Sequence, residues 1–425
     1  MKHFLVQQQL DNGITLITVP LASTEAVTCI VFMGVGSRYE SDHQRGLAHF
    51  AEHMVFKGGQ TYPTAQAIAQ TLDSVGGEFN AFTSHEFTGF YTKTAAHHFK
   101  LGLGVLADMV LHAQFPESEL EKEKGVITEE INMYDDMPMR KVDQLLATLV
   151  YGDSPLGRAI LGTKESVGSF TRADFLAYRD QFYKGAQCTV VVSGAVDHAE
   201  VKEEVAQAFA ILPKGKPYTP VAVHFADGKR VLIEERTSEQ THLMLAAHAY
   251  EVSHPKRHAY RVMATILGGN MSSRLFVRVR EERGLCYYVR AYPEMYLDSG
   301  ILVASAGVDN ARLPMAVEAI TAELRNIRDE LVGAEELERA KQFIIGKMLL
   351  ALEDSEQVAE FYGMQYLLER TVESPESIQA AVEAVTAEQV REVAQEILTD
   401  QRLRLAVIGP GHDAAKLEAL LTVGA

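Results

Sequence analysis

Residues 46–59 read GLAHFAEHMVFKGG, in which His49, Glu52 and His53 form the pattern H-x-x-E-H. This order is the inverse of the H-E-x-x-H signature of zinc hydrolases. Two histidines four residues apart lie on one face of a helix, so both imidazoles can reach the same metal ion. A carboxylate beside them can accept a proton from a water molecule. The stretch therefore indicates a zinc hydrolase, although a solvated helix face could carry the same pattern.

A zinc enzyme needs a third protein ligand and keeps one position open for water. The sequence from Pro116, PESELEKEKGVITEEINMYDD, is typical of a helix rich in carboxylates. Its expected buried stripe is Val126, Ile127 and Ile131. Glu123 and Glu130 are two helical turns apart and share a face, so one could bind the metal while the other orients a histidine. The acidic residues expected to be solvated are Glu119, Glu121 and Glu129.

Between these two helices, aromatic and small residues alternate with polar ones over residues 79–94. This period of two predicts strand structure. His85 falls inside the run, and His97 and His98 follow it. Adjacent histidines diverge on a helix, so we expect surface or core positions for His97 and His98 rather than a metal site.

Five stretches of the chain together resemble the pitrilysin, insulysin and mitochondrial processing peptidase family of inverted-motif zinc peptidases. They are GSRYE at 36–40, GLAHFAEHMVFKGG, GGEFNAFTSHEFTGFY, EKEKGVITEEI and RLFVRVREERGLCYYV, and the resemblance extends over nearly the whole chain. It implies one zinc ion per chain, held by His49, His53 and Glu130. It gives Glu52 the role of general base and Glu123 that of an auxiliary glutamate.

The same resemblance assigns residues outside the metal cluster. Arg280 and Tyr287 match the family's Arg/Tyr pair, in which the tyrosine would stabilise the oxyanion; Tyr288 is the alternative, one residue away. A family edge strand that pairs with an extended peptide matches the N-A-x-T positions of this chain. The corresponding substrate-binding residues would be Asn80, Ala81 and Thr83.

The 425 residues exceed the usual size of one domain. Each half opens with a β-rich segment, continues with helical periodicity and ends in a strand-like run, QCTVVVSGAV in the first and QRLRLAVIGP in the second. This predicts an α+β fold of two tandem duplicated domains, each a mostly antiparallel sheet packed with helices. We expect domains at 1–213 and 231–425, joined by a linker at 214–230. By resemblance, two such domains form half of a clam-shell chamber, and only the first carries the histidine cluster.

Composition limits the compartment and the partners. Three scattered cysteines do not form a disulfide framework, and no signal peptide or long apolar run is present, so we expect a cytoplasmic protein without a membrane span. The formal charge of −17 disfavours nucleic acid. The resemblance, and not the composition, implies peptides as substrates. It also implies that a homodimer would close the chamber, with a heterodimer with a paralogue as the alternative.

These observations predict a zinc metalloendopeptidase that hydrolyses oligopeptides or unfolded segments. The alternative is a non-catalytic scaffold or regulatory subunit of a processing-peptidase-like heterodimer, a class of protein that usually loses the metal ligands. A zinc deaminase would need H-x-E with P-C-x-x-C, which this sequence lacks.

Overall fold

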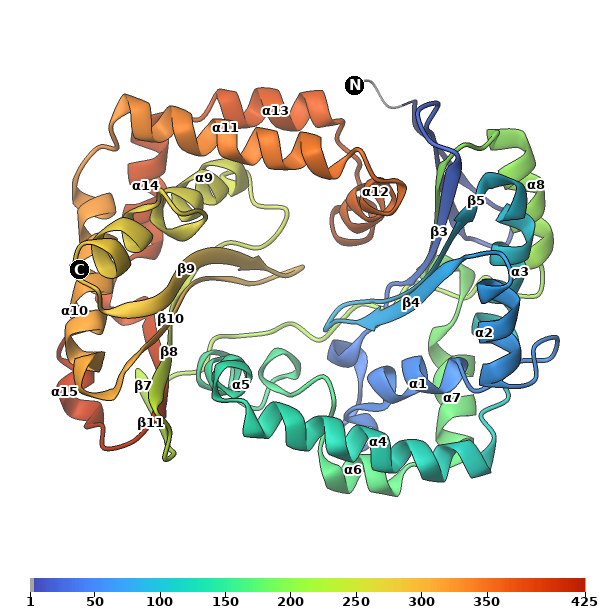
Figure 1. Ribbon diagram of the computed structural model, residues 1–425, viewed down its shortest axis with the longest axis horizontal. Helices are drawn as coiled ribbons and strands as arrows, with labels where there is room; N and C mark the ends of the chain where they lie inside the picture. Colours follow the sequence, from blue (N-terminus) through green and yellow to red (C-terminus); the bar gives the residue numbers. More distant parts are fainter. Residues whose placement is uncertain (1–3, 425) are drawn as a thin grey trace. The chain divides into compact units, whose positions relative to one another are not determined.

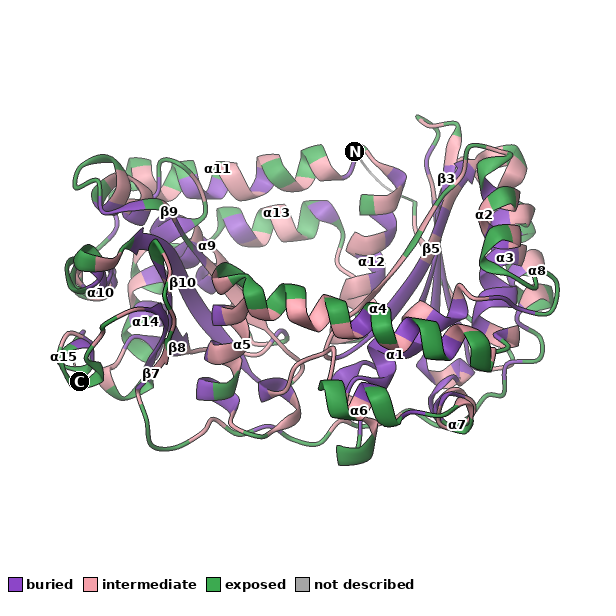
Figure 2. Cartoon of the chain, turned by 60° about the horizontal axis from the view of Figure 1, so that its bottom comes forward, coloured by how far each residue is buried: buried purple, intermediate pink, exposed green. Residues whose placement is uncertain are grey.

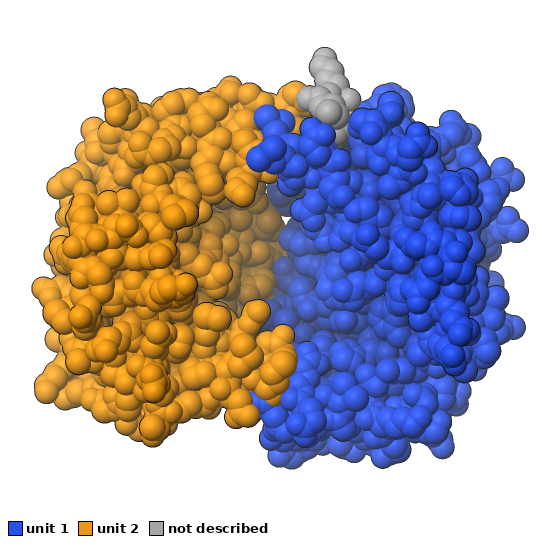
Figure 3. Space-filling view, in the orientation of Figure 1, with its two compact units in different colours: residues 1–132, 159–221, 349–374 blue, residues 133–158, 222–348, 375–425 orange. Residues whose placement is uncertain are grey.

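The computed structural model describes residues 4–424, which fall into two compact units (Figure 1). Within the described residues, unit 1 comprises 4–132, 159–221 and 349–374, and unit 2 comprises 133–158, 222–348 and 375–424 (Figure 3). A single boundary at 214–230 would not give this division. One segment of the first half belongs to unit 2, and one segment of the second half belongs to unit 1.

Unit 1 is built on a six-stranded sheet with the order β1-β2-β6-β3-β5-β4. Its strands are β1 (Val6–Gln9), β2 (Thr15–Pro20), β3 (Ala26–Met33), β4 (Glu78–Thr83), β5 (Thr88–Ala95) and β6 (Cys188–Gly194). The β2–β6 pair is parallel and the other pairs are antiparallel. Strand β4 lies at the edge of the sheet, as the resemblance implied for the peptide-pairing strand.

Unit 2 repeats this arrangement in a five-stranded sheet with the order β7-β11-β8-β10-β9. Its strands are β7 (Val231–Glu235), β8 (Gln240–His248), β9 (Cys286–Met295), β10 (Gly300–Asp309) and β11 (Leu403–Gly409). The parallel pair β7–β11 corresponds to the parallel pair β2–β6 of unit 1, and the other neighbours are antiparallel. Strand β1 is the additional strand of unit 1. The predicted α+β duplication with mostly antiparallel sheets is therefore confirmed.

Helices pack on both sheets. In the first half of the chain they are α1 (Leu47–Val55), α2 (Ala65–Asp73), α3 (Phe99–His112), α4 (Glu117–Asp136), α5 (Pro138–Tyr151), α6 (Lys164–Ser169), α7 (Arg172–Phe182) and α8 (His198–Ala208). In the second half they are α9 (Arg257–Gly268), a π-helix (Phe276–Glu281), α10 (Leu313–Asp329), α11 (Ala334–Ala351), α12 (Ser355–Glu369), α13 (Pro375–Glu383), α14 (Ala387–Ile397) and α15 (Ala414–Glu418). No helix within residues 4–424 is long and apolar enough to cross a bilayer.

One face of the unit 1 sheet is covered by α12, although this helix belongs to the second half of the sequence (Figure 1). The hydroxyls of Thr28 and Ser355 share a hydrogen bond of 2.8 Å, and Thr15 Oγ1 donates to Tyr366 Oη at 3.0 Å. The ring of buried Phe32 lies against Gly363. The opposite face packs on α1, α3 and α7 through a large apolar core.

Helix α5 covers the unit 2 sheet in the same way. Its residues Val142, Leu146 and Val150 join a core cluster with apolar side chains of the unit 2 strands. These strand residues are Met244, Ala246, Ile301, Val303, Ala406 and Ile408. The exchange of α5 and α12 explains why the compact units do not coincide with the two halves of the sequence.

The strand structure predicted for residues 79–94 is confirmed, but it is divided between β4 and β5, which form a hairpin. The chain turns back at 84–87, where Ser84 N donates to Phe87 O. The stripe predicted for α4 was wrong in part. Helix α4 buries Ile127 fully, but Val126 is 51% exposed and Ile131 is half-buried, so the apolar stripe is narrower than predicted. Figure 2 shows exposed residues along much of α4 and buried ones along the strands of both sheets.

Candidate metal centre

Helix α1 carries the H-x-x-E-H pattern on the side that faces away from the core. Leu47, Phe50 and Met54 are fully buried at helical spacing and fix the opposite side of this helix. The helix begins after Gly46, whose φ of 92° lies in the left-handed region. A β-carbon at Gly46 would lie 2.5 Å from the carbonyl oxygen of Leu161, so a larger residue would displace the start of α1.

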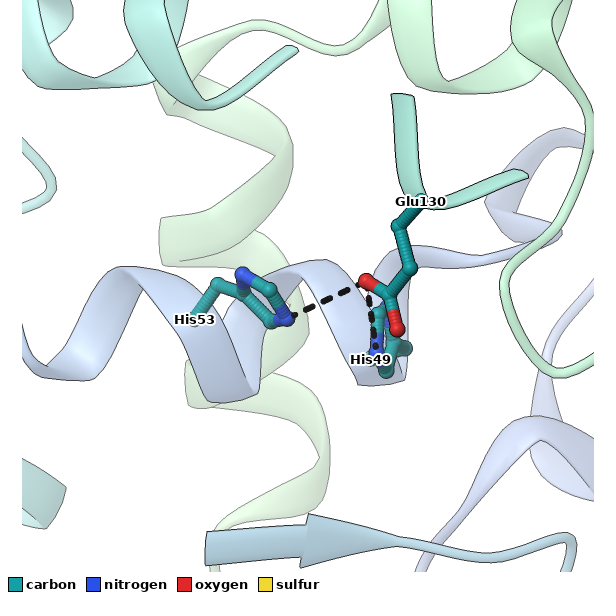
Figure 4. Close-up of side chains that lie close together, drawn as sticks. All are labelled: His49, His53 and Glu130. Carbon is teal, nitrogen blue, oxygen red and sulfur yellow. Dashed lines mark ion pairs between the residues drawn. The ribbon is translucent and has the colours of Figure 1, made fainter. Parts of the chain in front are cut away.

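The structure brings His49, His53 and Glu130 together (Figure 4), with one potential ligand atom of each lying within 4.8 Å of the others. Glu130 Oε2 is 3.7 Å from the Nε2 atoms of both His49 and His53. Zinc–ligand distances of about 2.0–2.2 Å in a tetrahedron place neighbouring donors roughly 3.4 Å apart. Two imidazole nitrogens and one carboxylate at this spacing fit a zinc ion.

The two histidines differ in their electrostatic surroundings. Burial, together with the neighbouring His53, lowers the pKa of His49 to about 4, which leaves a neutral imidazole with a lone pair for a metal. Burial also acts to lower the pKa of His53, but the hydrogen bond to Glu123 and the charges of Glu52, Glu123 and Glu130 outweigh it, and the pKa is raised. The three carboxylates thus favour positive charge at the position of His53.

Glu123 lies behind His53 rather than beside Glu130 as a further ligand. Its Oε1 is 2.9 Å from His53 Nδ1, and its Oε2 accepts from Lys57 Nζ at 2.7 Å. Burial opposes ionisation of Glu123, but the bonds from His53 and Lys57 hold its pKa below the usual range. A carboxylate on Nδ1 fixes the ring so that Nε2 points at the metal position. His49 Nδ1 is buried without such a partner among residues 4–424.

Glu52 is held by the edge strand of the sheet. Thr83 Oγ1, at the end of β4, donates to Glu52 Oε2 at 2.5 Å. Burial raises the pKa of Glu52, and the nearby carboxylate of Glu130 acts in the same direction. The hydrogen bond from Thr83 and the charge of His53 act to lower the pKa but are outweighed. A raised carboxylate pKa, closer to neutral pH, suits a group that accepts a proton and later returns it.

The remaining predicted residues occupy different places. Asn80 and Ala81 lie on β4, where Asn80 is exposed and its side chain accepts from Ala81 N at 2.9 Å. In unit 2, the guanidinium of Arg280 lies 5.6 Å from the ring centre of Tyr287, which is 76% exposed. Tyr288 is instead packed inward, with its hydroxyl 3.0 Å from His242 Nδ1. Arg280 sits in the π-helix, an irregularity often found at functional positions.

Sequence reasoning missed Lys57 and the bond between Thr83 and Glu52. Lys57 follows His53 by four residues, and this spacing could have drawn attention to it. Thr83 was predicted only as a substrate-binding residue, because the contact with Glu52 spans 31 positions and depends on how β4 lies against α1. His85 is half-buried, and its Nδ1 lies 3.0 Å from Ser37 Oγ.

Comparison with known proteins gives the family. The model of the insulinase family, peptidase family M16, matches residues 16–164, and that of the peptidase M16 inactive domain matches residues 169–344. A Bacillus subtilis relative described as the uncharacterized zinc protease YmxG is 35% identical over 94% of this chain and 97% of its own length. A Rickettsia bellii relative, also described as a zinc protease, is 33% identical over 97% of this chain and 99% of its own. The chain belongs to peptidase family M16.

Solved structures support the fold. A protease from Helicobacter pylori superposes with a TM-score of 0.86 at 21% identity, covering 96% of this chain and 99% of its own. A Pseudomonas fluorescens structure described as a peptidase M16 inactive domain gives a TM-score of 0.88 at 21% identity, covering 96% and 98%. The class defined by the family and its relatives is the zinc-dependent peptidase.

Proposed function

We propose that this chain is a zinc-dependent endopeptidase that hydrolyses oligopeptides or unfolded polypeptide segments and holds one zinc ion. The observation that carries the proposal is the position of Glu52. Its carboxylate is held by Thr83 next to the convergent His49, His53 and Glu130. An acidic side chain held in place beside a zinc-type donor set is what peptide hydrolysis requires.

His49, His53 and Glu130 would hold the ion, which when bound supplies Lewis acidity toward the scissile carbonyl and a more acidic water. Glu52 accepts the proton of the attacking water and passes it to the leaving amine nitrogen. Glu123 holds His53 by its Nδ1 and keeps the ring in one orientation. In this proposal Tyr287 donates a hydrogen bond to the oxyanion, and Arg280 supports it.

The edge strand β4 supports the choice of an extended peptide as substrate. An edge strand can pair with a peptide backbone regardless of sequence, and Asn80, Ala81 and Thr83 lie on the strand that ends beside Glu52. We further propose that the chain works in the cytoplasm, and that two copies form a homodimer whose halves enclose the substrate. A heterodimer with a paralogue is the alternative assembly.

The test is cleavage of a mixed library of unstructured peptides by the parent and by Glu52→Gln, with bound zinc measured in both. We expect zinc in both proteins and a loss of at least about 100-fold in cleavage in Glu52→Gln, since general base catalysis contributes this much or more. Glu129→Gln is the matched control, because Glu129 adjoins Glu130 in sequence but is exposed. It should cleave like the parent.

The alternative function is a non-catalytic scaffold or regulatory subunit. Equal activity of the parent and Glu52→Gln would overturn the peptidase mechanism and favour this alternative. If the parent holds no zinc after dialysis against a zinc solution, the assignment of His49, His53 and Glu130 as zinc ligands is contradicted.

A further inference from the structure

Residues 37–40 are not part of the group His49, His53 and Glu130, yet they contact two elements that carry site residues. They belong to the GSRYE stretch that precedes α1. The proposed mechanism gives them no role. Their side chains are nevertheless mostly buried, with Arg38 1% and Glu40 8% exposed. Buried charged groups need partners, and the partners of these two lie on different sides of the site.

Glu40 holds the start of α1. Its Oε2 accepts from Gly46 N at 2.8 Å and its Oε1 accepts from Ala48 N at 2.6 Å. These are backbone donors at the N-terminus of α1, where amide groups lack partners within the helix and favour negative charge. Ala48 immediately precedes His49, so this bidentate contact sets the height and rotation of the turn that carries the first metal-site histidine.

Arg38 and its backbone hold the turn of the β4–β5 hairpin. Arg38 Nη1 lies 2.5 Å from Glu86 Oε1, and both side chains are almost completely buried. Two backbone bonds reinforce this contact, from Ser37 N to Ser84 O at 3.2 Å and from Arg38 N to His85 O at 2.8 Å. The residue directly before this turn is Thr83, which holds Glu52.

We infer that residues 37–40 form a brace between α1 and the β4–β5 hairpin, with Glu40 as a positioning residue for zinc binding. The brace fixes α1 through Glu40 and the hairpin turn through Arg38. It therefore fixes Glu52, on α1, relative to Thr83, on β4. This inference rests on the proposed function for its effect on catalysis, but its effect on zinc affinity can be measured independently of any peptide cleavage.

The test compares two replacements at the two ends of the brace. Glu40→Gln keeps the shape but loses the charge, and its amide group offers one acceptor oxygen where two backbone donors need one each. We expect the zinc dissociation constant, measured by competition with a chelator, to rise about tenfold, as for other losses of ligand-supporting contacts. Glu86→Gln loosens only the hairpin end, so zinc affinity should stay within twofold of the parent while kcat falls with little change in KM.

Asp197→Asn is the matched control. Asp197 caps α8 by accepting from Ala199 N at 2.9 Å and Glu200 N at 3.2 Å, both through Oδ1. Its replacement removes a carboxylate charge at the start of a helix of unit 1 that carries no site residue. Its zinc affinity and kcat should equal those of the parent. Circular dichroism establishes that each variant is folded.

Two results would overturn the inference. One is a folded Glu40→Gln protein whose zinc affinity equals that of the parent, and the other is an equal loss of zinc affinity in Asp197→Asn. If Glu40→Gln does not fold, the Glu86→Gln variant decides. Where the parent cleaves peptides, a kcat of Glu86→Gln equal to that of the parent contradicts the brace. A parent that binds zinc but cleaves no peptide would count against the proposed function, while the zinc affinities would still test Glu40.

Discussion

His53 is the point at which several charges of the metal site meet. Its Nε2 faces Glu130, and its Nδ1 faces Glu123, whose other oxygen is held by Lys57. Because Lys57 occupies Oε2, the Oε1 atom remains directed at the histidine. The chain from Lys57 through Glu123 to His53 therefore orients a nitrogen ligand, although Lys57 itself is not among the ligands.

We predict that Lys57→Met weakens zinc binding by about tenfold and lowers kcat/KM by a similar factor or more, because loss of an outer contact typically costs 10- to 100-fold. Titration with a chelating competitor measures the first quantity. Lys122→Met is the control, since Lys122 forms a comparable 2.6 Å pair with Glu119 on the exposed side of α4. Equal zinc affinity in Lys57→Met and the parent would show that Glu123 orients His53 unaided.

At this scale, sequence spacing was informative where ligands share one helix. The interval of four residues brought His49 and His53 together, and the interval of seven brought Glu123 and Glu130 to one face of α4. Which glutamate faces the metal position was open from spacing alone, because it depends on how α4 packs against α1. The long-range partners of Glu52 and Glu123 depend on the same packing.

At the scale of elements, the exchanged helices α5 and α12 are the feature that sequence could not reveal. Amphipathic periodicity predicts that a helix buries one face, but it does not say which sheet receives that face. Helix α12 is close in sequence to the unit 2 helices, yet it packs on β3 and β6 of unit 1. The strands were predictable because their apolar runs are bounded by turns, as in QCTVVVSGAV.

Gly363 allows α12 to approach the sheet closely. A β-carbon there would lie 2.4 Å from the ring of Phe32, which is buried and has little room to move. We predict that Gly363→Ala lowers the free energy of unfolding of unit 1 by roughly 1–3 kcal/mol, the usual cost of overpacking. Urea denaturation followed by circular dichroism measures this change.

Gly346 in α11 provides the opposite case for comparison. A β-carbon at this position meets nothing within 4 Å, so Gly346→Ala should gain about 0.5–1 kcal/mol from helix propensity alone. If both alanine variants raise the stability, the close packing of α12 on Phe32 is not a constraint on the fold.

On the scale of the whole molecule, duplication has left two units that share the order of five strands, β1 of unit 1 being additional, and that differ in chemistry. Helix α1 follows β3 in unit 1, and α9 follows β8 at the corresponding point of unit 2. Where α1 carries the metal-site histidines, α9 buries apolar and aromatic side chains, among them Tyr260, Met263 and Leu267. Unit 2 instead keeps ionisable groups around β9, the counterpart of the edge strand β4.

Glu294 on β9 makes the stability of unit 2 depend on pH. Burial, together with the nearby carboxylate of Asp143, raises the pKa of Glu294 to about 7, against the effects of Tyr296 and Arg290. In the unfolded chain the pKa is about 4.3. Between these values the folded state binds more protons than the unfolded state, so the free energy of unfolding falls as pH rises from about 4.3 through 7 and then levels off.

We predict that Glu294→Gln, which carries no charge at any pH, stabilises unit 2 at pH 8 by up to about 3 kcal/mol, and that this gain shrinks toward zero near pH 4.5. Denaturation curves at several pH values between 4.5 and 8 measure the difference. Glu318→Gln on α10 is the control, because Glu318 is exposed and its replacement should leave the pH dependence unchanged. A gain for Glu294→Gln that is the same at every pH would mean that packing of the amide, and not the buried charge, determines its effect.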